Sequence, residues 1–123
     1  MTLPTPLPTI DVVEAERRLR EDPLRPLLVD VREPNEFVVV RAPGAFLLPT
    51  STFMARYDEL PDDRPLLVIC HTGSRSAAVT GFLARGGRAD VANVAGGMAA
   101  WERAGLPIRR GATEPGEGDL PAA

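Results

Sequence analysis

The sequence predicts an α/β fold in which a mostly parallel sheet is covered by helices on both faces. Short, mostly apolar runs occur at 27–31, 66–69 and 91–94. Runs of this kind, without polar alternation, are typical of parallel strands buried on both sides. They are separated by segments with helical periodicity, and the 123 residues suffice for one domain of this architecture.

The helical segments fill the intervals between these strands. Helices are expected over residues 11–20, 33–39, 51–60, 76–85 and 99–104, with a further strand at 45–48. Asp11 can cap the first helix, since Glu14 follows three residues later, and Ser51 can cap the third. Gly86 and Gly87 end the fourth. In such sheets, ligand-binding and catalytic residues lie at the carboxyl ends of the strands.

Cys70, the only cysteine, stands at such an end. It follows the apolar run 66–69 and opens a loop that leads into the helix at 76–85. Gly73 allows the loop to turn sharply, and backbone amides at the start of the helix can converge on the sulfur. Such a cradle favours thiolate over thiol. A lone cysteine is more commonly a small buried hydrophobe, but its place before Gly73 and Arg75 favours a nucleophile.

Four segments together indicate a family. The loop 70–76 has the form C-x-x-G-x-R-S. The other three segments are LVDVREPNEF at 28–37, PGA at 43–45 followed by Pro49, and GGMAAW at 96–101. In order and spacing they resemble the motifs of the single-domain rhodaneses, sulfurtransferases that carry sulfur as a cysteine persulfide. The resemblance covers about residues 9–108 and implies a rhodanese-like three-layer fold with a mostly parallel five-stranded sheet.

The resemblance also implies a double displacement at Cys70. The thiolate takes sulfur from a small anionic donor such as thiosulfate, or from a persulfide donor. The Cys70 persulfide then passes the sulfur to a thiophilic acceptor, which is cyanide, a thiol or a carrier protein. No metal or organic cofactor is required. Because the chain has no second cysteine, the sulfur must leave to an external acceptor.

The rest of the loop is expected to bind substrate. Its residues are His71, Thr72, Gly73, Ser74, Arg75 and Ser76. Arg75 can stabilise the thiolate, the persulfide or the anionic donor, or it can brace the loop through an ion pair. Ser76 can contact the sulfur or simply cap the helix. Asp30 and Arg32 are accessory candidates: the resemblance implies mainly a structural ion pair for Asp30 and leaves substrate contact open for Arg32.

One position departs from the family pattern. The family usually has a Gly-His pair before the PGA segment, and this chain has Val40-Arg41 there. Arg41 either adds positive charge to the rim of the site or is a solvated loop residue.

Composition excludes several other functions. The net charge of −3 gives no general attraction to nucleic acid or anionic membranes. All 14 basic residues are arginine, which excludes a lysine Schiff base, and the single histidine leaves too few ligands for a zinc site. No apolar run approaches the ~20 residues of a membrane span, and residues 1–8 lack the features of a signal peptide. The expected location is the cytoplasm, whose reducing conditions suit a working thiol.

The chain is divided into three parts on composition. Residues 1–8 are expected to form an N-terminal extension and residues 9–108 the rhodanese-like domain. Residues 109–123 are rich in Gly, Pro, Ala and Glu, have little to bury, and are expected to be disordered.

Two alternative functions stay open. The chain could be a sulfur-carrier or regulatory module that keeps the fold without turnover, although retention of Cys70, Gly73 and Arg75 argues against this. It could also be a cysteine phosphatase or arsenate reductase, which likewise holds a cysteine in an amide cradle. The loop of those phosphatases is one residue longer between cysteine and arginine, and the shorter loop here encloses a single sulfur more readily than a tetrahedral oxyanion.

Overall fold

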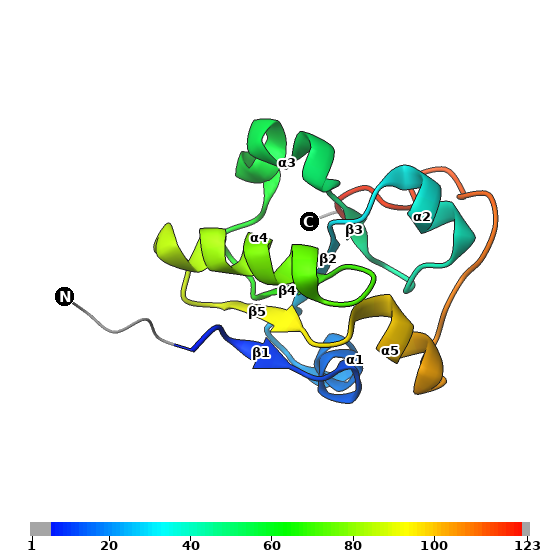
Figure 1. Cartoon of the computed structure of the whole chain (residues 1–123), viewed down its shortest axis with the longest axis horizontal. Helices are drawn as coiled ribbons and strands as arrows, with labels where there is room; N and C mark the ends of the chain where they lie inside the picture. Colours follow the sequence, from blue (N-terminus) through cyan, green and yellow to red (C-terminus); the bar gives the residue numbers. More distant parts are fainter. Residues whose placement is uncertain (1–5, 122–123) are drawn as a thin grey trace.

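The computed structural model describes residues 6–121 and contains one five-stranded sheet, shown in Figure 1. The strands are β1 (Thr9–Ile10), β2 (Leu27–Asp30), β3 (Phe46–Leu47), β4 (Leu66–Ile69) and β5 (Val91–Val94). They are ordered β1-β5-β4-β2-β3, and every pairing is parallel. The predicted α/β class is confirmed. The short edge strand β1 was not predicted, because two residues carry too little periodicity to be recognised.

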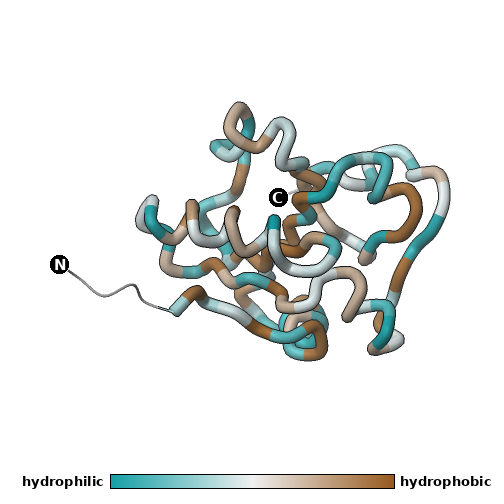
Figure 2. The backbone as a smooth tube through the Cα atoms, viewed as in Figure 1, coloured by the Kyte–Doolittle hydropathy of each residue, from teal (hydrophilic) through white to brown (hydrophobic). Residues whose placement is uncertain are grey.

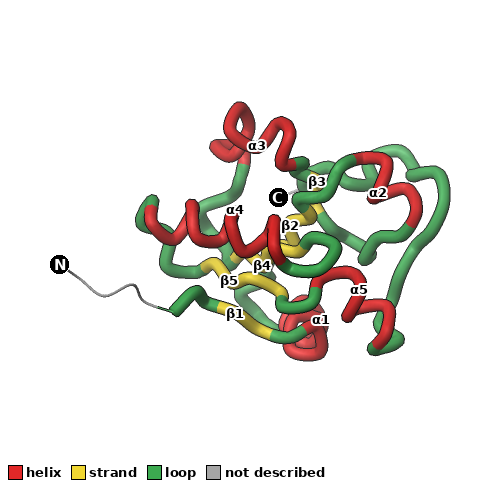
Figure 3. Tube along the Cα trace, in the orientation of Figure 1, coloured by secondary structure: helices red, strands yellow, loops and turns green. Residues whose placement is uncertain are grey.

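Helices connect the strands and cover both faces of the sheet (Figures 1 and 3). They are α1 (Val12–Glu21), α2 (Pro34–Val39), α3 (Thr50–Arg56), the 3₁₀ turn η1 (Tyr57–Glu59), α4 (Ser74–Arg85) and α5 (Gly97–Arg103). Asp11 caps α1 as predicted, its carboxylate accepting from the amide of Glu14 at 2.8 Å. α4 and α5 each begin two residues earlier than predicted, because Gly73 and Gly96 in left-handed conformations turn the chain directly into the helix.

The helix after β3 differs from the prediction at both ends. Pro49, and not Ser51, precedes its first residue, and the Ser51 hydroxyl instead donates to Glu33 of the neighbouring loop at 2.6 Å. The helix ends at Arg56 and tightens into η1.

Successive side chains of the central strands point to opposite faces of the sheet, so the apolar core has two parts. Leu28, Leu67 and Ile69 face the layer that contains α1, α2 and α5. Val29 and Val68 face the layer of α3 and α4, and Cys70 belongs to this second core. Figure 2 shows that hydrophobic residues make up much of the central strands. Since both faces are covered, the strands are mostly apolar, with Asp30 and Asn93 as buried polar exceptions, which explains the runs seen in the sequence.

The chain after α5 is ordered over the described residues, in contrast to the disorder expected for residues 109–123. We call residues 109–121 the C-terminal strap. Figures 1 and 3 show it running back past α2 towards β3. Arg109 and Arg41 exchange two backbone hydrogen bonds, of 2.8 and 2.9 Å, and the Leu47 amide donates to the Gly118 carbonyl at 2.8 Å. Backbone bonds therefore hold a segment that has little apolar surface to bury.

Arg41 is the anchor of the strap, and neither role expected from the sequence fits it. Its side chain is only 1% exposed, so it is not a solvated loop residue or a charge at the rim. The guanidinium donates to both carboxylate oxygens of Glu117 and to the Gly111 carbonyl. Burial of an arginine is costly unless its charge is paired and its donors are satisfied, and the strap supplies both.

We expect Glu117→Gln to lower the free energy of unfolding at neutral pH. The free energy of unfolding of the variant should also depend less on pH in the acid range. Arg41, with the amide of Glu114 and the charge of Arg109, lowers the pKa of Glu117 from 4.5 to about 2. Because the folded-state pKa is depressed, this contribution is present above pH ~4.5 and is lost as the pH falls towards ~2. Urea unfolding should show wild type and variant converging at acid pH. A difference that stays constant over this range would contradict the role of the pair.

No helix in residues 6–121 is long and apolar enough to cross a bilayer. The predicted N-terminal extension falls partly outside the described residues, as do the last two residues of the predicted tail. The division of the chain at residues 8 and 108 stays a prediction.

Candidate active site

The Cys70 sulfur sits in a cradle formed by the loop that follows β4. The Gly73 amide donates to it at 3.1 Å and the Ser76 hydroxyl at 3.3 Å. Cys70 is 1% exposed and Ser76 is fully buried. Ser76 lies in the first turn of α4. Because the loop is short, this turn lies next to the end of β4, and the Ser76 hydroxyl reaches the sulfur.

The cradle favours the thiolate. Burial by itself raises the pKa of the Cys70 thiol, but this effect is outweighed by hydrogen bonds from the Ser76 hydroxyl and from the amides of Ser76, Gly73 and Thr72. The net result is a pKa below the ordinary value. A thiolate is the nucleophilic form of cysteine, so the geometry prepares Cys70 for attack on an electrophilic atom.

Gly73 gives the loop its shape. Its φ of +108° is one that residues with a side chain rarely adopt, and a Cβ there would lie 3.2 Å from the Gly96 amide nitrogen. The Asn93 amide group, on β5, donates to the Gly73 carbonyl at 3.4 Å. Asn93 is buried, and its side-chain oxygen has no hydrogen-bond partner among the described residues. The loop is thus held from the sheet side by a residue that the sequence did not single out.

The start of α5 supports the other side of the loop. The Met98 amide donates to the Cys70 carbonyl at 2.8 Å, and the Ala99 amide donates to the His71 carbonyl at 2.9 Å. Gly97 permits this approach, because a Cβ on it would overlap the Cys70 carbonyl oxygen and lie 2.6 Å from the His71 carbonyl carbon. The sequence identifies Gly96-Gly97 as a turn, which is confirmed, but it does not reveal this contact with the backbone of Cys70 and His71.

We expect Gly97→Ala to impair the site much more than Gly105→Ala. Both glycines have positive φ, +55° and +70°, so both substitutions cost roughly 1–2 kcal/mol in backbone strain. A Cβ at Gly105 meets no atom within 4 Å, whereas a Cβ at Gly97 would push α5 away from the Cys70 loop. Melting temperature and the rate of Cys70 alkylation test this. Equal effects of the two substitutions would show that the close approach of α5 is unimportant.

Arg75 is held in a bidentate ion pair by Glu36 of α2. The two terminal guanidinium nitrogens donate to the two carboxylate oxygens at 2.7 and 2.8 Å. The side chains are 35% and 30% exposed. The hydrogen bonds from Arg75 lower the pKa of Glu36 to about 2, and Glu36 raises that of Arg75. The ion pair considered from the sequence is therefore present, and its acidic partner is a residue that sequence reasoning missed.

Asp30 and Arg32 form a second ion pair beneath the site. Both side chains are buried, and the Arg32 guanidinium donates to the two Asp30 oxygens and to the Val40 carbonyl. It makes a further bond of 3.3 Å to the Glu36 carbonyl. This places Asp30 in the structural pair that the resemblance implied. Arg32 is 2% exposed with its donors engaged within the fold, which argues against substrate contact.

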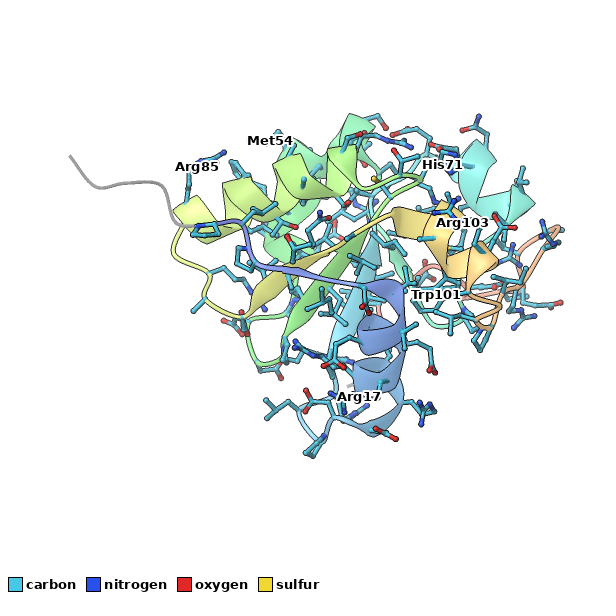
Figure 4. All side chains as sticks on the ribbon, turned by 60° about the horizontal axis from the view of Figure 1, so that its bottom comes forward. Arg17, Met54, His71, Arg85, Trp101 and Arg103 are labelled. Atoms are coloured by element: carbon cyan, nitrogen blue, oxygen red, sulfur yellow. The ribbon has the colours of Figure 1, made fainter. Side chains whose placement is uncertain are left out.

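The other predicted loop residues lie at the surface. His71, Thr72 and Ser74 are exposed. Figure 4 places His71 at the opposite end of α4 from Arg85, where the loop enters the helix. In residues 6–121 no cluster of His, Cys, Asp or Glu has the arrangement of a metal site. The loop therefore holds a buried sulfur that accepts hydrogen bonds from Gly73 and Ser76, with exposed polar residues around it.

Comparison with known proteins agrees with this geometry. The chain is 40% identical over 82 residues to a sulfurtransferase of Allochromatium vinosum, covering 67% of this chain and 77% of that protein. It is 39% identical over 82 residues to the thiosulfate sulfurtransferase GlpE of Actinobacillus succinogenes, covering 67% and 74%. A rhodanese-related protein of Thermoplasma volcanium superposes with a TM-score of 0.76 at 27% identity, covering 83% and 97%. The rhodanese-like domain model matches residues 11–104, and the chain belongs to this family.

Proposed function

We propose that the protein is a sulfurtransferase that moves sulfur through a persulfide on Cys70. The observation that carries the proposal is the cradle itself: a lone cysteine whose sulfur accepts bonds from Gly73 and Ser76 and whose pKa is lowered by them. Relatives named sulfurtransferase and thiosulfate sulfurtransferase support the same reaction class.

The reaction proceeds in two displacements. The Cys70 thiolate attacks the outer sulfur of thiosulfate, the bond between the two donor sulfurs breaks, and sulfite leaves with the electron pair. The new terminal sulfur carries the negative charge, so amides of the loop stabilise it as they do the thiolate. An acceptor then attacks this terminal sulfur and the bond between the two sulfurs breaks, which restores the Cys70 thiolate. When the acceptor is cyanide, the product is thiocyanate. A thiol or a carrier protein would accept the sulfur in the same way.

The chemistry sets limits on donor, acceptor and compartment. The donor is a small anion or a persulfide, and the acceptor is external because Cys70 is the only cysteine in the sequence. No cofactor enters either step. A thiol that must return to its reduced form in each cycle suits a reducing compartment such as the cytoplasm.

A two-substrate assay tests the proposal. Purified protein should form thiocyanate from thiosulfate and cyanide, and it should not hydrolyse an aryl phosphate at a comparable rate. Phosphatase activity without thiocyanate would favour the phosphatase interpretation. Stable persulfide formation with no turnover to any acceptor would favour the carrier or regulatory module.

A further inference from the structure

The position of Arg75 depends on a residue far away in the sequence. Arg75 lies in the first turn of α4, and Glu36, which binds both of its terminal nitrogens, lies 39 residues earlier on α2. No other hydrogen bond of the Arg75 side chain occurs within residues 6–121. The place of the guanidinium is therefore determined by the place of this one carboxylate.

The Glu36 carboxylate is itself restrained. One of its oxygens also accepts from the Glu33 amide at 3.0 Å, which completes a capping box at the start of α2. Glu33 in turn accepts from the hydroxyl and amide of Ser51, on α3. The carboxylate that meets Arg75 is thus tied to two helices, so it is a fixed partner for the guanidinium.

The far end of α2 is anchored as well. The Arg41 guanidinium donates to the Phe37 carbonyl at 3.3 Å, and the Gly111 amide of the C-terminal strap donates to the Val38 carbonyl at 2.7 Å. A Cβ on Gly118 would lie 3.3 Å from the Phe37 ring, so the strap also packs closely on this helix. Both ends of the short helix that carries Glu36 are therefore held in place.

We propose that Glu36 is a positioning residue that holds Arg75 where its guanidinium acts on the sulfur of Cys70 and on an anionic donor. The proposal rests on the proposed function. Because Glu36 offsets the charge of Arg75, the pair contributes oriented N–H groups more than net positive charge. A bidentate carboxylate uses one N–H from each terminal nitrogen, and the remaining N–H groups are left to bind an anion.

Many partly exposed arginine–glutamate pairs have little effect, so the alternative is an ordinary surface pair. The chain contains a matched example: Arg56 binds Glu59 with two bonds of 2.9 and 3.0 Å, within α3 and η1. Glu59→Gln removes such a pair without touching the Cys70 loop and is the control. Glu36→Gln is the test, because glutamine keeps an acceptor for the Glu33 amide but cannot accept from both arginine nitrogens.

The first measurement does not depend on catalysis. It is the pH dependence of Cys70 alkylation in wild type, Glu36→Gln, Arg75→Ala and Glu59→Gln. If Glu36 positions Arg75, its loss releases the guanidinium, and the alkylation midpoint moves to higher pH, in the same direction as for Arg75→Ala. If Arg75 stays in place without Glu36, loss of a negative charge moves the midpoint to lower pH. A lower or unchanged midpoint would overturn the proposal.

The second measurement is a double-mutant cycle on thiosulfate turnover. Glu36→Gln should lower kcat/KM by roughly 10- to 100-fold, as expected for a misplaced binding group, and Glu59→Gln should leave it unchanged. In the Arg75→Ala background Glu36→Gln should have no further effect, because a residue that acts through Arg75 has nothing left to position. If the two substitutions instead reduce kcat/KM independently, so that their fold-changes multiply in the double variant, the proposal is overturned. Absence of thiosulfate turnover in wild type would count against the proposed function, and the alkylation result would still decide the role of Glu36.

Discussion

Replacing Cys70 by serine should abolish both persulfide formation and thiocyanate production while the protein keeps its fold. Serine is close in size, and its hydroxyl can accept the bonds that the Gly73 amide and the Ser76 hydroxyl now make to sulfur. A hydroxyl cannot carry sulfane sulfur as a persulfide, and no other cysteine is available in the sequence. Thiocyanate formation and circular dichroism measure the two effects. Normal turnover in a folded Cys70→Ser variant would rule out the mechanism.

Replacing Arg75 by alanine should have the next largest effect on activity. The substitution removes the guanidinium and with it the ion pair to Glu36. The anionic donor then loses the N–H groups of the guanidinium, so kcat/KM for thiosulfate should fall by roughly 10²- to 10³-fold, the range found when a transition-state donor is lost. Stability should change by no more than about 1 kcal/mol, because the pair is partly exposed.

The lysine variant separates charge from geometry. Arg75→Lys keeps the positive charge but cannot donate to both Glu36 oxygens through a planar fork, so it should recover only part of the activity. The pH profile of Cys70 alkylation should move upward in the alanine variant, because the N–H groups with which Arg75 would stabilise the thiolate are gone. An unchanged profile together with a lower melting temperature would make Arg75 a purely structural residue.

The part of the site that the sequence could indicate is the local geometry of the Cys70 loop. Cys70, Gly73 and Ser76 lie within seven residues, so a strand, a left-handed glycine and a helix start suffice to bring amides and a hydroxyl to the sulfur. The two-faced sheet was predictable for a similar reason. Strands buried on both sides are mostly apolar on both faces, and that pattern is visible without any knowledge of the neighbouring strands.

The parts missed are contacts between distant segments. Glu36 lies in a polar stretch where any carboxylate could have been solvated, and only the fold shows that it meets Arg75. The C-terminal strap has the composition of a disordered segment, yet its partner is a buried arginine 76 residues before Glu117. The composition of a segment indicates how much apolar surface it can bury. It does not indicate whether backbone hydrogen bonds and an ion pair hold the segment against the rest of the fold.

The departure at Val40-Arg41 is explained by the same contact. Arg41 follows α2 and points into the strap, and Val40 is buried in the core beside Phe37. The sequence difference from the family pattern therefore lies at the junction between the domain and its C-terminal strap. It leaves the Cys70 loop unchanged, because Arg41 donates to residues of α2 and of the strap and to none of the loop.

Mass spectrometry of the intact protein tests the central claim most directly. After incubation with thiosulfate and removal of excess reagent, the mass of the wild-type chain should increase by one sulfur atom, and cyanide or dithiothreitol should remove the increase. Peptide mapping should place the added sulfur on Cys70, and Cys70→Ser should show no gain. An unchanged wild-type mass under conditions that yield thiocyanate, or added sulfur at any residue other than Cys70, would contradict a Cys70 persulfide intermediate.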